Sequence, residues 1–94
     1  MATIYLDNNA TTAVDPRVLQ AMLPYFTEQY GNASSLHALG EGAAQALAQA
    51  RAQVARLLNV PARRIVFTSG ATESNLTALR AALAGADGRR RIVT

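Results

Sequence analysis

The sequence contains no cysteine, no tryptophan and no lysine, and all nine of its basic residues are arginine. Without cysteine the chain has no thiol nucleophile, no disulfide and no thiolate ligand for a metal ion. Without lysine it has no side-chain amine that could form a Schiff base. Within these 94 residues, covalent chemistry that needs either side chain is therefore excluded.

Long apolar runs and a dominant charge are also missing. No stretch approaches the roughly 18 uninterrupted apolar residues of a membrane span, and no signal sequence opens the chain, so we expect a cytoplasmic protein without a membrane partner. The net charge of +3 and the pI near 10.2 depend largely on Arg89, Arg90 and Arg91. No aromatic residues alternate with these arginines, so nucleic acid is not a predicted partner.

Local signals predict three helices. Asp15 followed by a proline is typical of a helix start, and Pro24 is expected to kink that helix or to restart it. An apolar period of three to four residues predicts the longest helix over residues 36–58, ended by residues 59–61. A further helix is expected to begin near Thr72, and it carries its leucines on one face.

Two runs are typical of strands. Residues 64–68 are apolar, β-branched or aromatic and lie between turn-forming residues, which predicts a buried strand. Residues 91–94 are expected to open the next strand, so this half of the chain predicts a β-α-β arrangement in a mainly parallel sheet. Residues 3–6 are expected to form a short strand or an extended arm before a polar turn over residues 7–9.

The clearest chemistry lies at residues 68–75, where the predicted strand meets the helix. A helix N-terminus offers unpaired N–H groups and the positive end of the helix dipole, which together favour an anion. Gly70 would let the backbone approach a phosphate, Ala71 is too small to block it, and Thr72 adds a hydroxyl donor. The commoner alternative is a plain glycine turn with Thr72 as helix cap. Glu73 opposes an anion unless its carboxylate bonds elsewhere.

Two further polar segments are harder to assign. Residues 6–12 are polar and compact, which suits a turn held by local side-chain hydrogen bonds. Residues 30–35 are rich in turn formers and are typical of a functional loop. The lone imidazole, His37, has no cysteine partners, so no metal site is predicted, and a place at a helix entry or facing solvent is expected.

Four segments resemble, in order and spacing, the start of a cysteine desulfurase, a class V aminotransferase with fold-type I pyridoxal phosphate chemistry. They are Tyr5–Thr12, Asp15–Val18, Gly31–His37 and Phe67–Asn75. The resemblance covers essentially the whole chain. It implies an α/β fold, with residues 1–15 as an N-terminal arm and residues 16–94 as the incomplete start of the large cofactor domain. Ala33 and Leu76 depart from the family, which commonly has Pro and Asn there.

The resemblance also implies a function. Cysteine desulfurases are homodimers that convert L-cysteine to L-alanine, leave a persulfide on a catalytic cysteine, and pass the sulfur to an acceptor or to an iron–sulfur scaffold protein. The turn that holds the cofactor phosphate corresponds to Gly70, Ala71 and Thr72. The segments near the active site correspond to regions that contain Asn8, Asn9, Asn32 and His37.

No catalytic residue is assigned in this chain, because the family's cofactor lysine and persulfide cysteine have no counterpart in it. We therefore expect an N-terminal part of the enzyme that is inactive alone. The alternatives are a non-catalytic module for partner binding or dimerisation, and a related class V transaminase or lyase. As an isolated chain it is expected to expose sheet edges and apolar helix faces and to be poorly soluble.

Overall fold

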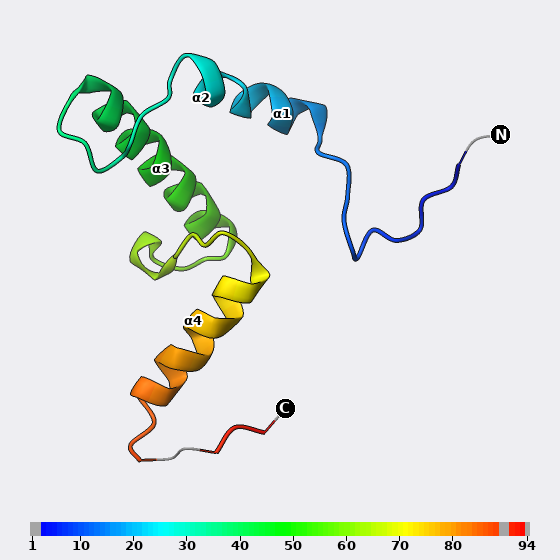
Figure 1. The fold of residues 1–94 in the computed structure, drawn as a ribbon, viewed down its shortest axis with the longest axis vertical. Helices are drawn as coiled ribbons and strands as arrows, with labels where there is room; N and C mark the ends of the chain where they lie inside the picture. The colour runs from blue at the N-terminus through cyan, green and yellow to red at the C-terminus, as the bar shows by residue number, and fades with distance from the viewer. Residues whose placement is uncertain (1–2, 89–90, 94) are drawn as a thin grey trace. The chain divides into compact units, whose positions relative to one another are not determined.

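The computed structural model describes residues 3–88 and 91–93, and the regular structure within them is helical (Figure 1). The elements in chain order are α1 (Pro16–Met22), α2 (Pro24–Thr27), α3 (Ala38–Leu57), the 3₁₀ helix η1 (Ala62–Arg64) and α4 (Ala71–Ala84). The chain divides into two units, one up to Gln53 and one from Val54 onward. Each unit is described by itself.

The first helices begin where the sequence predicts. Asp15 is the N-cap of α1, and its carboxylate accepts a hydrogen bond of 2.8 Å from the Arg17 amide. The same carboxylate forms an ion pair with the Arg17 guanidinium at 2.8 Å, which together with the amide bond lowers the pKa of Asp15. Pro24 then begins α2 directly after α1 ends, so the predicted restart is confirmed.

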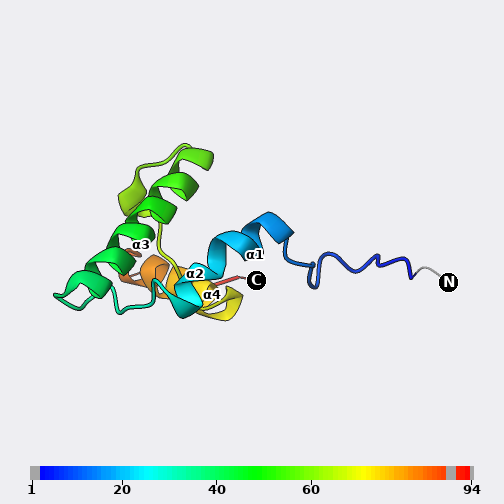
Figure 2. The same ribbon diagram turned by 90° about the horizontal axis from the view of Figure 1, so that it is seen from above.

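Residues 3–15 have no assigned strand and include a turn at residues 8–10, and Figure 2 shows them as a bare trace that leads into α1. For residues 3–6 the short strand is therefore not observed, and the extended form is. The polar turn is held locally, because the Tyr5 hydroxyl lies 2.9 Å from the Asp7 carbonyl oxygen and 3.0 Å from that of Thr11. The Ala10 amide also donates to the Asp7 carbonyl at 3.0 Å.

The start of α3 depends on a glycine. Gly40 is buried, and a Cβ atom there would overlap the Ser35 carbonyl oxygen and lie 2.8 Å from the Asn32 carbonyl oxygen. The preceding loop is built on Asn32, whose side-chain oxygen accepts from the Ser34 amide at 2.9 Å. His37 stands at the helix entry, where its Nδ1 accepts a long bond of 3.4 Å from the Gly40 amide. A glycine that weakens helix propensity therefore allows the loop to lie against α3.

The end of α3 is set by Asn59, which adopts a left-handed conformation with φ of 52°. The Val60 amide donates to the Ala55 carbonyl at 2.9 Å, and the Asn59 amide donates to the Arg56 carbonyl at 3.2 Å. These two bonds form a Schellman motif, which satisfies the last carbonyls of a helix. The stop predicted at residues 59–61 is confirmed, and the helix bounds differ from the prediction by one or two residues.

The predicted sheet is not confirmed. Within residues 3–88 and 91–93 no strand is assigned. Arg64 belongs to η1, and Ile65 follows in an extended conformation with φ of −90° and ψ of 123°. Residue 94 of the second predicted strand lies outside the described residues, as do Arg89 and Arg90. The apolar pattern favours extended backbone, but a strand forms only when a neighbouring strand supplies the ladder hydrogen bonds.

Few side chains are covered. Among the described residues, Ala55 is the one buried apolar residue, with 3% of its surface exposed. On the predicted apolar stripe of α3, Ala43, Ala46 and Val54 are half-buried, whereas the leucines of the stripe, such as Leu39 and Leu47, are exposed. On α4, Leu79 keeps 44% exposure, so the expected uncovered helix faces are present. In the described ranges no helix is both long and apolar enough to cross a bilayer.

Candidate functional site

The segment that carries the predicted chemistry forms the N-terminus of α4. The N-cap is Gly70, whose backbone is extended with φ of 166° and ψ of −178°, and which has no side chain to provide a cap hydrogen bond. The helix begins at Ala71, one residue earlier than predicted, so Thr72 is the second helical residue. The alternative in which Thr72 is the helix cap is therefore wrong, because Gly70 is the N-cap.

The first turn of α4 leaves its donors unused. The Ser74 amide bonds to the Gly70 carbonyl at 3.1 Å. The amides of Ala71, Thr72 and Glu73 find no acceptor in the described part of the chain, and neither does the Thr72 hydroxyl. A Cβ atom built on Gly70 meets no atom within 4 Å. Open space beside unpaired helix-terminal donors is what an anion such as a phosphate requires.

Hydrogen bonds between side chains hold this turn together. The Glu73 Oε2 atom accepts from the Ser69 amide at 2.7 Å and from the Ser69 hydroxyl at 2.6 Å. The Thr68 and Ser74 hydroxyls lie 2.6 Å apart, and each lies 3.2 Å from the Gly70 carbonyl oxygen. The Glu73 carboxylate is therefore bonded to Ser69, the residue before the cap.

Ser69, the partner of Glu73, was not predicted from the sequence. The usual capping signal is a Ser or Thr three residues before a Glu, whereas these two residues are four apart. The available signal was a serine four residues before a glutamate, with a glycine between them at the cap position. This spacing predicts a Ser69–Glu73 hydrogen bond only once the helix is known to begin at Ala71.

These hydrogen bonds lower the pKa of Glu73, with the Ser69 hydroxyl as the larger cause and the Ser69 amide as the next. A carboxylate whose pKa in the folded state lies below its ordinary value of 4.5 stabilises the fold above that pH. This contribution is lost as the pH falls through the lowered pKa. Glu73 is therefore ionised at neutral pH and holds Ser69 there.

Acidification is expected to release Ser69 from Glu73. In the chain labelled with ¹⁵N-serine, the Ser69 amide proton should move upfield as the pH is lowered below 4.5, since a carboxylate acceptor is exchanged for a neutral one. The Ser34 amide is the control, because it donates to the neutral Asn32 side chain. Parallel movement of both amides would contradict the assignment.

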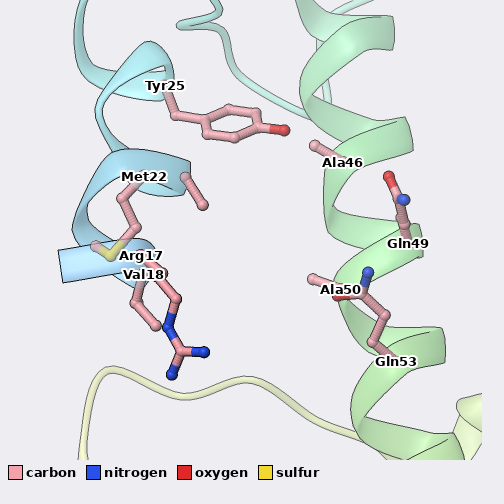
Figure 3. Close-up of a pocket in the computed structure, with 9 residues that line it drawn as sticks. Arg17, Val18, Met22, Tyr25, Ala46, Gln49, Ala50 and Gln53 are labelled. Atoms are coloured by element: carbon pink, nitrogen blue, oxygen red, sulfur yellow. The ribbon is translucent and has the colours of Figure 1, made fainter. Parts of the chain in front are cut away.

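A separate groove lies within the first unit, between the α1–α2 segment and α3 (Figure 3). It is lined mostly by apolar or neutral side chains, namely Val18, Ala21, Met22, Tyr25, Ala46, Gln49, Ala50 and Gln53, together with Arg17. Arg17 is the charged member, and it is paired with Asp15. Among the described residues that line the groove, the Tyr25 hydroxyl is therefore the one group that could act as an acid, a base or a nucleophile.

The other predicted site residues lie in the first unit. Asn8 and Asn9 belong to the exposed N-terminal turn, Asn32 forms the loop turn before α3, and His37 is exposed at the helix entry. Their place near an active site stays a prediction. Among the described residues no group of three or more His, Asp or Glu side chains could hold a metal ion.

Comparison with known proteins gives a consistent match. The family model described as aminotransferase class V matches residues 4–94. The chain is 57% identical over 99% of its length to a cysteine desulfurase of Bradyrhizobium diazoefficiens, and 58% identical over 96% to one of Rhodobacter capsulatus. It is 55% identical over its full length to cysteine desulfurase 2 of Trichormus variabilis.

In each case the chain spans about a quarter of the relative's length, 24%. No solved structure matches it. The family match extends over nearly every residue, including the α4 turn with its unpaired donors. The chain belongs to the aminotransferase class V family.

Proposed function

We propose that this chain provides the cofactor-phosphate turn of a pyridoxal phosphate-dependent cysteine desulfurase, which converts L-cysteine to L-alanine and an enzyme-bound persulfide. The observation that carries the proposal is the first turn of α4. Its amides at Ala71 and Thr72 and its Thr72 hydroxyl are unpaired beside Gly70, in a chain 57% identical to a cysteine desulfurase. The family implies fold-type I architecture and pyridoxal phosphate as cofactor.

The residues present fit the phosphate of this cofactor. Ala71 and Thr72 would donate their amides to phosphate oxygens, the Thr72 hydroxyl would add a third donor, and Gly70 leaves the space that the phosphate needs. The positive end of the α4 dipole favours the same charge. Pyridoxal phosphate supplies the electron sink that cleavage of the carbon–sulfur bond requires.

The chain contributes binding and orientation, and no covalent step. It has neither a lysine to hold the cofactor nor a cysteine to carry the persulfide. We therefore propose that these 94 residues are inactive alone. In the whole enzyme the proposed partners are L-cysteine, a second copy of the enzyme, and a sulfur acceptor or iron–sulfur scaffold. The division into an arm over residues 1–15 and the start of the cofactor domain over residues 16–94 is proposed with it.

A hybrid protein tests this function. Residues 1–94 replace the matching quarter of the Bradyrhizobium diazoefficiens cysteine desulfurase, and pyridoxal phosphate binding and products from L-cysteine are measured. We expect the hybrid to bind the cofactor and to release alanine and, with a thiol reductant, sulfide in equal amounts. The relative itself is the positive control, and the 94-residue chain is the negative control.

Several outcomes would contradict the proposal. A hybrid that is insoluble, or that folds without binding pyridoxal phosphate, would show that these residues do not replace the relative's own turn. Cofactor binding without alanine and sulfide, or formation of a keto acid from L-cysteine, would favour the alternative of a related class V enzyme.

A further inference from the structure

The turn that follows α4 contains an aspartate directly before a glycine. Asp87 and Gly88 both lie in the left-handed region, with φ of 41° and 82°, and both are exposed. The hydrogen bonds of the helix end with the Ala86 amide, which donates to the Leu83 carbonyl at 3.3 Å. Among the described residues the amides of Asp87 and Gly88 have no backbone acceptor, so little holds this turn in one conformation.

An aspartate followed by glycine has an intrinsic reaction with its neighbour. The amide nitrogen of the glycine attacks the carboxyl carbon of the aspartate and closes a five-membered succinimide ring. Glycine favours this step because it has no Cβ atom beside the attacking nitrogen and because its backbone rotates freely. A Cβ atom built on Gly88 meets nothing within 4 Å, so the surrounding atoms leave room for the ring.

Ring closure requires the backbone of Asp87 to rotate until the Gly88 nitrogen reaches the carboxyl carbon. The left-handed conformation of Asp87 does not oppose this rotation strongly, because a residue with a Cβ atom is disfavoured in that region. An exposed turn that lies outside the helix hydrogen bonds opens with little cost in free energy. The structure therefore leaves the nitrogen, the carboxyl group and the backbone between them free to react.

The other two aspartates of the chain lack these features. Asp15 precedes Pro16, which has no N–H group, and its carboxylate is paired with Arg17 at 2.8 Å. Asp7 precedes Asn8, whose Cβ atom crowds the amide nitrogen. The carbonyl oxygen of Asp7 also accepts hydrogen bonds from a tyrosine hydroxyl and from two amides, which restrain its backbone. Asp87 is therefore distinguished by both its neighbour and its surroundings.

We propose that Asp87 is a site of aspartate isomerisation. The Gly88 nitrogen bonds to Cγ of Asp87 and a carbon–oxygen bond of the carboxylate breaks, so that this oxygen leaves as water with the amide proton and one solvent proton. Water then opens the ring at either carbonyl and returns one proton to solvent. Opening at Cγ restores aspartate, whereas opening at the α-carbonyl gives isoaspartate. No atom is oxidised or reduced.

Isoaspartate changes the connection that follows α4. The main chain then runs through the side-chain carboxyl group, which adds one methylene between α4 and residues 91–93, and the α-carboxylate becomes the side group. A carboxylate of this kind is the group that isoaspartyl methyltransferases methylate with S-adenosylmethionine, so the modified turn is a substrate of that class. The isomerisation needs no cofactor and no active site, and it does not depend on the function proposed above.

Incubation of the 94-residue chain at neutral pH in water enriched in ¹⁸O tests the proposal. Each passage through the succinimide places one ¹⁸O atom on residue 87, and electron-transfer fragmentation distinguishes isoaspartate from aspartate. The chain is kept dilute, because it is expected to be poorly soluble and mass spectrometry needs little material. A synthetic peptide of residues 83–92 sets the incubation time.

Label and isoaspartate are expected at Asp87. Because a turn with a low opening free energy gives little protection, the rate should lie within about threefold of the rate in the peptide. Labelling of Asp7 should be slower by about tenfold or more, which corresponds to a barrier higher by about 1.4 kcal/mol. Asp15 should take up no label, since Pro16 has no N–H group to close a ring.

Three variants assign the reacting atoms. Asp87→Glu keeps the charge but would need a six-membered ring, and it should take up no label in the same period. Gly88→Ala adds a methyl group beside the attacking nitrogen and should slow isoaspartate formation about tenfold. Asp87→Asn reaches the same ring with ammonia as the leaving group, and it should form isoaspartate faster than the parent does.

The outcomes decide whether the turn is such a site. Isoaspartate at Asp87 that is absent from Asp87→Glu and reduced in Gly88→Ala would support it. An unlabelled Asp87 after the peptide has converted would show that the folded turn protects the residue, and equal labelling of Asp7 would show that neither the glycine nor the turn selects Asp87. Either of these two results would overturn the proposal.

Discussion

Thr72→Val is expected to weaken pyridoxal phosphate binding to the hybrid protein by about 10- to 100-fold. The Thr72 hydroxyl has no partner among the described residues, so its proposed acceptor is the cofactor phosphate. A hydrogen bond to a charged group contributes about 1.5–3 kcal/mol, which corresponds to this range of affinity. Valine keeps the branched shape and loses the hydroxyl, so the change isolates the donor.

Thr77→Val is the matched control. Thr77 lies on the same helix, is exposed and makes no hydrogen bond through its side chain in the described part of the chain. The same substitution there should leave cofactor affinity unchanged while altering helix propensity equally. Equal affinities of the two variants by fluorescence titration would show that the Thr72 hydroxyl does not bind the phosphate.

Gly40→Ala is expected to destabilise the region where the loop over residues 31–37 meets α3. A Cβ atom at Gly40 would overlap the Ser35 carbonyl oxygen, and backbone atoms move less readily than a flexible side chain. Overpacking of this kind costs about 1–3 kcal/mol. Thermal unfolding of the hybrid protein should show a lower melting temperature, and amide exchange at Ser34 and Ser35 should become faster.

Gly42→Ala is the control for this prediction. Gly42 belongs to the same helix, and a Cβ atom there meets nothing within 4 Å. Because alanine favours a helix over glycine by about 0.5–1 kcal/mol, this variant should be slightly more stable than the parent. Stabilisation by both substitutions would show that the loop does not press against Gly40 and that the observed packing is wrong.

The helix bounds follow from chemistry that acts over a few residues, which is why they could be predicted. Asp15 accepts from an amide two residues away, Pro24 can begin a helix but not continue one, and Asn59 tolerates the left-handed conformation of a helix end. The donors of the α4 turn were predictable for the same reason. Every helix N-terminus leaves its first amides unpaired, whatever lies around it.

Two features depended on contacts that the local sequence pattern does not place. The partner of Glu73 follows from the residue at which α4 begins, and a helix start at Ala71 rather than Thr72 brings the carboxylate to Ser69. Glycine is needed at position 40 because a loop packs against it. Helix propensity alone would predict that this glycine destabilises α3.

By itself the sequence determined the helices, the polar turns and the donors of the proposed phosphate turn, because each depends on neighbours within about four residues. Tertiary structure decided whether residues 64–68 become a strand, and no strand is assigned among the described residues. The physical reason is that a helix satisfies its backbone hydrogen bonds internally, whereas a strand needs a second strand from elsewhere in the fold.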